Sequence, residues 1–337
     1  MDSINIKKLA KELNLSTSTI SRAFRGSSDI NKETKERVLS LAYELNYEPN
    51  HHASNLRDQK SNTIAVIVPE IANNFFSQAI NGIERIAREN GYHILIYLTY
   101  DDFDKETSFI GNLHSGRVEG IIMSVSGENK NHDYLNKLKK KNIPLVFFDR
   151  VYDDIDTSKV TSNDYESSFS ATEHLINNGC RNIAYLVVNK NHSIGKMRMN
   201  GYIDALIKHK INYRDELIID CSNDLTQNIE ILSKAFKELK PDGIFASVER
   251  LAIASYQVCK NENIKIPEDI KLISFSSLEI ASLLSPSLST ITQPALEMGV
   301  ESARLLFDAI KSKGSKNVSQ HVVCNSKIIS RESSAKA

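Results

Sequence analysis

The stretch Leu15-Ser16-Thr17-Ser18-Thr19-Ile20-Ser21-Arg22 decides the fold of the N-terminal region. A helix is expected before it, because apolar residues recur at helical spacing over 6–13, behind Asn5 as the N-cap. That helix ends near Asn14, since Asn enters the left-handed region more cheaply than most residues. Ser16 then caps a second short helix. Its inner face carries Ile20, Ala23 and Phe24, and its outer face carries Thr17, Ser18, Ser21 and Arg22.

Two helices joined by a tight turn, the second with small hydroxyls and an arginine outward, form a helix-turn-helix that can enter a major groove. Small side chains allow a close approach to base edges, and Arg22 can bond a guanine bidentately. The alternative for residues 5–24 is an ordinary helical hairpin, because this pattern has false positives. A third helix favours a DNA-binding headpiece: Asn31 caps it, Thr34 lies in its first turn, and its buried stripe is Val38, Leu41, Ala42 and Leu45.

The segment from Ile6 to Arg57 resembles the headpiece of the LacI/GalR family of bacterial transcription regulators. The matching patterns are Leu15-Ser16, Thr19-Ile20-Ser21-Arg22, Thr34-Lys-Glu-Arg37-Val38, Glu44-Leu-Asn-Tyr47, and Pro49-Asn50 with Ala53 and Leu56. The resemblance continues to Ser330-Arg331-Glu332-Ser333 and so covers nearly all of the chain. It implies a sequence-specific DNA-binding transcription regulator. We expect a repressor of carbohydrate-utilisation genes that is controlled by a small, sugar-like effector.

The expected DNA contacts come from the headpiece and from a hinge that follows it. The hinge is too short to be a firm helix alone, so we expect it to order only on DNA, where Leu56 would enter the minor groove between base steps. The expected DNA-binding residues are Ser16, Thr17, Ser18, Thr19, Ser21, Arg22, Asn31, Thr34, Tyr47, Asn50, Ala53, Leu56 and Arg57.

Charge and composition agree with such a regulator. The chain has no net formal charge, and residues 1–60 hold ten Lys and Arg against eight Asp and Glu, a balance of +2. Phosphate attraction by one headpiece is therefore weak, and we expect a homodimer that places two headpieces on a near-palindromic operator. The four cysteines lie far apart without zinc spacing, and we expect neither a secretory signal nor a membrane span. These features predict a cytoplasmic protein.

From Ser61 onward, apolar runs alternate with amphipathic stretches, which is typical of βαβ units on parallel sheets. Two such series predict two doubly wound lobes with a ligand cleft between them. The resemblance implies the periplasmic-binding-protein-like (type I) form, with lobe crossings near 162–163, 290–293 and 320–323.

The expected domains are a headpiece (1–48), a hinge helix and linker (49–60), and an effector-binding and dimerisation domain (61–337). Its N-lobe would hold about 61–161 and 291–320, and its C-lobe about 162–290 and 321–337.

The chain carries no pattern typical of an enzyme. Neither GxxxxGK[ST] nor GxGxxG after a first strand occurs, no nucleophile elbow follows a strand, and the histidines have no metal-ligand spacing. We therefore expect no catalytic residue, no metal and no cofactor. The competing classes are a secreted sugar-binding protein, which would have no use for residues 1–57, and a sugar-modifying α/β enzyme, which would need a catalytic constellation.

The resemblance also implies an effector site between the lobes. Phe75 and Phe76 would stack on a sugar or base ring, Asp149 would bind effector hydroxyls, and Arg198 would clamp the ligand. Alternatives are a core role for one phenylalanine, an ion pair of Asp149 with Arg150, and a structural salt bridge for Arg198. Where the family commonly has Asp, this chain has Ser276, so Glu249 is expected to hold the effector instead. The full expected set is Phe75, Phe76, Ser124, Asp149, Arg198, Glu249, Ser276 and Gln293. A regulator of the same architecture that responds to a purine or another metabolite is the alternative function, and induction or corepression stays open.

Overall fold

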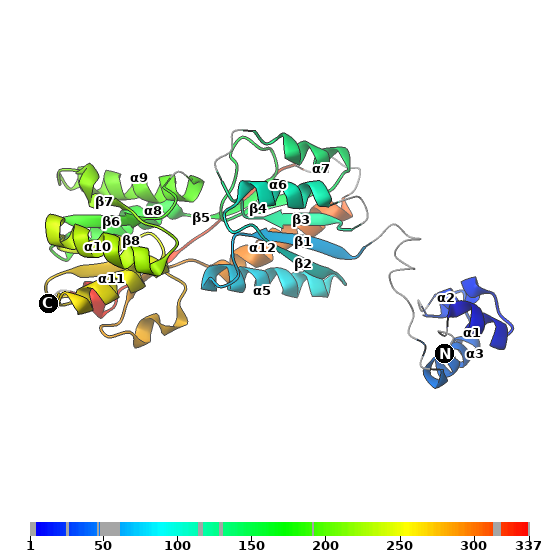
Figure 1. Cartoon of the computed structure of the whole chain (residues 1–337). Coiled ribbons are helices and arrows are strands. Elements are labelled where there is room, and N and C mark those ends of the chain that lie inside the picture. Colours follow the sequence, from blue (N-terminus) through cyan, green and yellow to red (C-terminus); the bar gives the residue numbers. More distant parts are fainter. Residues whose placement is uncertain are drawn as a thin grey trace. The chain divides into compact units, whose positions relative to one another are not determined.

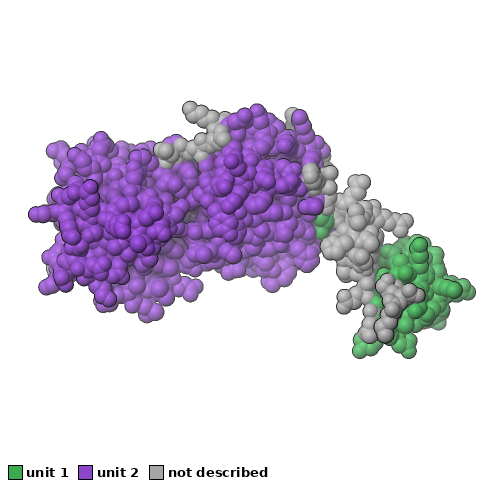
Figure 2. Space-filling model, in the orientation of Figure 1, with its two compact units in different colours: residues 1–61 green, residues 62–337 purple. Residues whose placement is uncertain are grey.

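The computed structural model describes residues 5–24, 27–45, 47, 61–113, 117–127, 131–190, 192–312 and 318–335. The chain forms two compact units, residues 1–61 and 62–337, which Figure 2 colours separately. We refer to the first as the headpiece unit and to the second as the effector unit. No helix in the described part of the chain is long and apolar enough to cross a membrane.

The described residues of the headpiece unit form three helices: α1 (Ile6–Glu12), α2 (Thr17–Phe24) and α3 (Lys32–Glu44). The caps lie where the sequence predicts them. The Asn5 side chain accepts hydrogen bonds from the first turn of α1, and Asn31 Oδ1 accepts one from the Thr34 amide at 2.7 Å. Asn14 turns the chain with φ 56°, in the left-handed region where Asn is tolerated. The three helices share one small core of Leu9, Ala10, Ile20, Ala23, Val38 and Ala42.

The N-lobe of the effector unit is built on a six-stranded sheet with the order β11-β5-β4-β3-β1-β2, of which Figure 1 labels β1 to β5. The pairings in this sheet are all parallel. Its strands are β1 (Thr63–Val68), β2 (His93–Leu98), β3 (Gly120–Met123), β4 (Leu145–Phe148), β5 (Ser158–Ser162) and β11 (His321–Cys324). One face packs on α5 (Asn74–Glu89) and α12 (Ala295–Lys311), and the other on α6 (Phe103–Asn112), η1 (Asp133–Leu135) and α7 (Asn136–Lys140).

The C-lobe repeats this plan on a sheet with the order β12-β10-β9-β8-β6-β7. Its strands are β6 (Ile183–Val187), β7 (Ile218–Asp220), β8 (Gly243–Ala246), β9 (Lys271–Phe275), β10 (Ser289–Thr292) and β12 (Lys327–Ile329). Helices α8 (Asp164–Asn177) and α9 (Ser193–Lys208) cover one face, and α10 (Leu225–Leu239) and α11 (Glu249–Asn261) the other. Three short helices complete it: η2 (Asp215–Leu217), η3 (Glu279–Leu283) and η4 (Glu332–Ser334). The predicted pair of parallel-sheet lobes is confirmed, with β12 as an antiparallel edge strand.

In its described residues the chain crosses between the two sheets three times, after β5, after β10 and after β11. The third crossing was predicted at 320–323, and this placement is wrong. Residues 321–324 form β11, which pairs in parallel with β5 and so satisfies the backbone groups at that edge of the N-lobe sheet. The crossing therefore lies at 325–326. Residues 291–292, predicted for the N-lobe, belong to β10 in the C-lobe sheet.

Candidate ligand cleft and nucleic-acid interface

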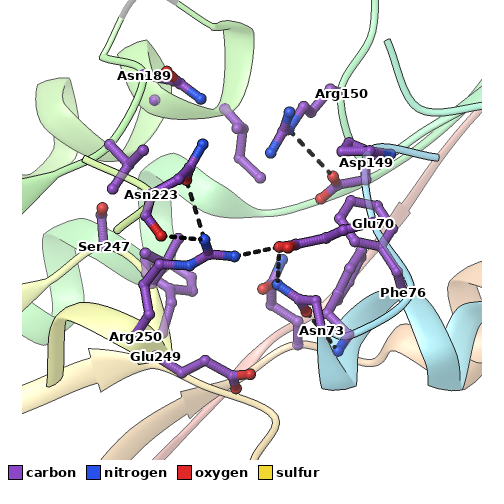
Figure 3. Close-up of a pocket in the computed structure, with 18 of the residues that line it drawn as sticks. Glu70, Asn73, Phe76, Asp149, Arg150, Asn189, Asn223, Ser247, Glu249 and Arg250 are labelled. Carbon is purple, nitrogen blue, oxygen red and sulfur yellow. Dashed lines mark hydrogen bonds and ion pairs between the residues drawn. The ribbon is translucent and has the colours of Figure 1, made fainter. Parts of the chain in front are cut away.

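A cavity of about 360 Å³ lies where the carboxyl ends of strands from both sheets face each other (Figure 3). Loops after β1, β2 and β4 line it from the N-lobe, and loops after β6, β7, β8 and β9 line it from the C-lobe. Ligands of open parallel sheets bind at this end of the strands, because the loops that can carry polar side chains gather there. The volume falls within the usual range of small-molecule sites.

Most of the predicted effector residues meet at this cavity. Seven of the eight predicted residues line it: Phe75, Phe76, Asp149, Arg198, Glu249, Ser276 and Gln293. Ser124 does not line it. It is fully buried beneath, and its hydroxyl donates to Asp149 Oδ2 at 3.3 Å. Gln293 sits at the second crossing, with Nε2 at 3.5 Å from the Ser162 hydroxyl at the first.

The two predicted aromatic residues serve the core and the cavity together. Phe75 and Phe76 lie in the first turn of α5, touch each other edge to face, and belong to the apolar cluster of the N-lobe. Phe76 also meets Phe148 edge to face. From the C-lobe, Phe275 supplies a ring over which the guanidinium of Arg198 lies, 3.6 Å from the ring centroid. Apolar ring surface therefore borders the cavity from both lobes.

Arg198 combines a structural ion pair with a free donor. Its Nε donates to Asp164 at 2.7 Å and its Nη1 to the Ser247 carbonyl at 2.6 Å. Its Nη2 is buried and has no hydrogen-bond partner among the described residues, and neither do the hydroxyls of Ser247 and Ser277. Since buried polar groups are nearly always paired, these three unpaired atoms of cavity-lining residues are candidates for contacts with a ligand.

Asp149 follows β4 in a constrained conformation. Its φ is 61°, a left-handed geometry that non-glycine residues adopt mainly at turns and functional sites. Burial raises the pKa of its carboxyl to about 6, although Arg150 and Arg198 partly offset this effect. Arg150 Nε lies 4.0 Å from Asp149, but the main ion pair of Arg150 is with Asp101. The Asp149–Arg150 ion pair, which was the alternative to an effector-binding role for Asp149, is thus present only as a long secondary contact.

The side chains of Ser276 and Glu249 are hydrogen-bonded to each other. The Ser276 hydroxyl and the Ser277 amide both donate to Glu249 Oε2 at 3.2 Å. Burial raises the pKa of Glu249, and these hydrogen bonds oppose the rise. A carboxylate from the start of α11 is therefore held next to Ser276.

Sequence reasoning missed several polar residues that line the cavity, among them Glu70, Asn73, Asn223 and Arg250. Arg250 forms an ion pair with Glu70 across the cleft, and its Nη1 donates to the Asn223 carbonyl at 3.3 Å. Asn73 Nδ2 donates to Glu70 at 3.2 Å. Figure 3 shows this chain of contacts spanning the cavity. Glu70 and Asn223 both lie shortly after a strand, and this position is the signal that could have identified them.

The outward face of α2 stays accessible in the headpiece unit. Ser16, Thr17, Ser18 and Arg22 are exposed, and Thr19 and Ser21 are half-buried. The Ser16 hydroxyl accepts from the Thr19 amide at 3.1 Å and so caps α2; it also bonds the hydroxyls of Ser18 at 2.7 Å and Thr19 at 2.9 Å. Arg22 Nη1 lies 3.8 Å from Asp29, and its Nε donates to the Ser18 carbonyl at 3.4 Å.

The other expected DNA contacts are placed differently. Asn31 and Thr34 are joined as the cap of α3, and Tyr47 packs against Phe24 with its ring centroid at 5.8 Å. Burial raises the pKa of Tyr47. Asn50, Ala53, Leu56 and Arg57 lie outside the described residues.

Comparisons with known proteins match both units. The family described as "Bacterial regulatory proteins, lacI family" matches residues 5–50, and "Periplasmic binding proteins and sugar binding domain of LacI family" matches residues 61–329. Catabolite control protein A of Priestia megaterium is 28% identical over 305 residues, which are 90% of this chain and 91% of that protein. The ribose operon repressor of Haemophilus influenzae is 28% identical over 308 residues, 91% and 92% of the two chains.

Solved structures agree with this assignment. A lacI-family regulator from Enterococcus faecium with bound ribose is 26% identical, with a TM-score of 0.71, and the match covers 82% of this chain and 99% of that one. The lac repressor dimer bound to operator shares the fold at a TM-score of 0.84 and 20% identity, covering 99% and 100%. From these matches to both of its units, the chain belongs to the lacI family of bacterial regulatory proteins, as a DNA-binding transcription regulator controlled by a small molecule.

Proposed function

We propose that the protein is a cytoplasmic repressor of carbohydrate-utilisation genes whose effector is a sugar or sugar derivative bound in the cleft. The observation that carries the proposal is a set of polar atoms from cavity-lining residues that have no hydrogen-bond partner in the described part of the chain: Arg198 Nη2, Ser247 Oγ and Ser277 Oγ. They stand beside the rings of Phe75, Phe76 and Phe275. Directed donors next to apolar rings suit a polyhydroxylated ring, which presents hydroxyls at its edge and C–H groups on its face.

On the DNA side, Thr17, Ser18 and Arg22 would read base edges in the major groove, because they share the exposed face of α2. The headpiece would span 1–48 and the hinge 49–60, with Leu56 entering the minor groove. A homodimer on a near-palindromic operator would supply the affinity that one headpiece with a balance of +2 lacks. The effector would shift the angle between the lobes and so couple the cleft to the hinges.

Relatives support a sugar as effector. Ribose operon repressors are among them, and a regulator of similar fold, 22% identical, was solved as a cellobiose complex. A purine could also stack on the phenylalanine rings, so purines form the second arm of the test.

Arg198→Ala is not a clean probe, because it would leave Asp164 buried without its cation.

The experiment is a thermal-shift screen of the full chain against aldoses, disaccharides and purines. Each ligand that raises the melting temperature is then tested for its effect on affinity for a DNA duplex selected from a random library. We expect a sugar at 100 times its Kd to stabilise the effector unit by about 2.7 kcal/mol. It should also change the affinity for DNA. If purines are the only ligands that raise the melting temperature and change the affinity for DNA, the alternative is favoured. If neither sugars nor purines raise the melting temperature, the proposal is refuted.

Glu249→Gln provides a matched test of the site. Glutamine keeps an acceptor for the Ser277 amide but removes the charge from the cavity. We expect the sugar affinity to fall by about tenfold, the value of one charge-assisted hydrogen bond, with no loss of melting temperature. The control is Glu262→Gln at the end of α11, where the side chain pairs with Lys237 away from the cavity. Equal ligand affinity in both variants would remove Glu249 from the site.

A further inference from the structure

Glu70 and Arg250 form an ion pair between the lobes. Glu70 follows β1 in the N-lobe, and Arg250 lies in the first turn of α11 in the C-lobe. Among the described residues, this is the one Arg–carboxylate pair that joins the two lobes. Both side chains are about 30% exposed, and both line the cavity (Figure 3). A ligand entering the cleft therefore meets a guanidinium that already has a carboxylate partner.

The same holds for every arginine of the cavity. Arg150 pairs with Asp101 from its own lobe, and Arg198 pairs with Asp164 at 2.7 Å. Among the described residues that line the cavity, there is no lysine and no histidine. All three guanidinium groups are thus neutralised from within the protein. The backbone amide of Phe75 in the first turn of α5 is also paired, because it donates to Asn73 Oδ1 at 2.9 Å.

Within the described ranges, two carboxyl groups of the cavity have no cation of their own. Asp149 lies 4.0 Å from Arg150, whose main partner is Asp101. Glu249 accepts hydrogen bonds from Ser276 and Ser277 and forms no ion pair with a described residue. Burial raises the pKa of both carboxyls, as expected where opposite charge does not compensate for lost hydration. A ligand anion would meet these carboxylates and would find no unpaired cation, whereas hydroxyls can donate to both acids and accept from Arg198 Nη2.

We propose that the cleft selects uncharged polyhydroxylated ligands over anionic ones, and that Glu70 sets this selectivity by occupying Arg250. The proposal rests on the proposed sugar-binding function and names the charge of the ligand. A uronate or a sugar phosphate must displace the carboxylate of Glu70 from Arg250 before it gains an ion pair. The displaced Glu70 carboxylate, still close by, then repels the ligand.

The test compares matched ligands on the full chain. The probes form two sets. One is D-glucose, D-glucuronate and D-glucose 6-phosphate, and the other is D-galactose, D-galacturonate and D-galactose 6-phosphate. Within each set, only the group at the sixth carbon changes. Calorimetric titration of the wild-type protein should show the uronate and the phosphate binding at least about tenfold more weakly than the aldose. A uronate or phosphate that binds as tightly as its aldose would overturn the proposal and leave the sugar-binding function intact. If no sugar of any kind binds, the proposed function fails and this inference falls with it.

Glu70→Gln tests the role assigned to Glu70. Glutamine keeps an oxygen for the amide of Asn73 but releases the charge of Arg250. The preference for aldose over uronate should then shrink by about tenfold, and the second substitution in Glu70→Gln/Arg250→Gln should restore it. The control is Glu84→Gln on α5, which breaks an exposed Glu–Arg pair of 3.6 Å outside the cavity. Melting curves confirm folding of each variant. An unchanged preference in folded Glu70→Gln would refute the assignment of Glu70.

Discussion

Replacing Asp149 by Asn should make the effector unit more stable at high pH and weaken its ligand binding. Asp149 is buried, and its pKa is raised to about 6 from an ordinary 3.8. Asparagine keeps the acceptor for the Ser124 hydroxyl and tolerates the left-handed φ of 61°. The substitution therefore removes the buried charge and leaves the local geometry unchanged.

The sign follows from the direction of this shift. A carboxyl whose pKa is raised on folding binds its proton more tightly in the folded state, so its contribution favours folding below pH 3.8. That contribution is lost as the pH rises through 6. The difference between the two pKa values corresponds to about 3 kcal/mol of stabilisation at low pH, all of which is lost by pH 8. About half of it has already been lost at pH 5. Between pH 5 and pH 8, Asp149→Asn should gain about 1.5 kcal/mol relative to the wild type.

The assay is urea unfolding followed by circular dichroism at pH 5 and pH 8, using the transition of the effector unit. The control is Asp153→Asn in an exposed turn, which should follow the wild type at both pH values. Ligand affinity of the wild type should rise with pH through about 6, because an ionised Asp149 accepts hydroxyl donors better. A stability difference between Asp149→Asn and the wild type that does not change with pH would refute the reasoning.

Two further predictions concern packing and base readout. Gly299→Ala should destabilise the effector unit by about 1–3 kcal/mol, because its Cβ would lie 2.0 Å from the Ala79 carbonyl where α12 meets α5. Gly111→Ala in α6, where a Cβ meets nothing within 4 Å, should be neutral or stabilising, and thermal melts compare the two. Arg22→Ala should cost about 1–3 kcal/mol of operator binding and relax the preference at one base pair. A selected binding-site logo that matches the wild type would contradict this role for Arg22.

The sequence determined the headpiece almost completely, because its decisive interactions are local. Asn5, Ser16 and Asn31 cap helices by bonding amides two or three residues away, and Asn14 turns the chain by its own conformational preference. Such interactions depend on neighbours in the sequence and can be predicted from it. The alternation of apolar runs and amphipathic stretches likewise determined the two α/β lobes, since each strand and helix reveals its own period.

The cleft was predictable only in part. Family resemblance placed Phe75, Phe76, Asp149 and Arg198 at the cavity, and they line it. It could not reveal that Arg198 would be paired with Asp164 while keeping one free nitrogen. A charged residue near the end of a strand has many possible partners in the sequence, and only its position in the folded lobes selects one of them.

Tertiary structure alone decided the longest-range features. Glu70 meets Arg250 because two separate lobes bring the loop after β1 against the start of α11, 180 residues further along the chain. The strand β11 joins the N-lobe sheet for a related reason. A four-residue strand carries too weak a pattern to choose between two sheet edges, and hydrogen bonding to β5 made the choice. Local patterns determine which elements form, whereas the pairing of distant polar groups depends on how those elements pack.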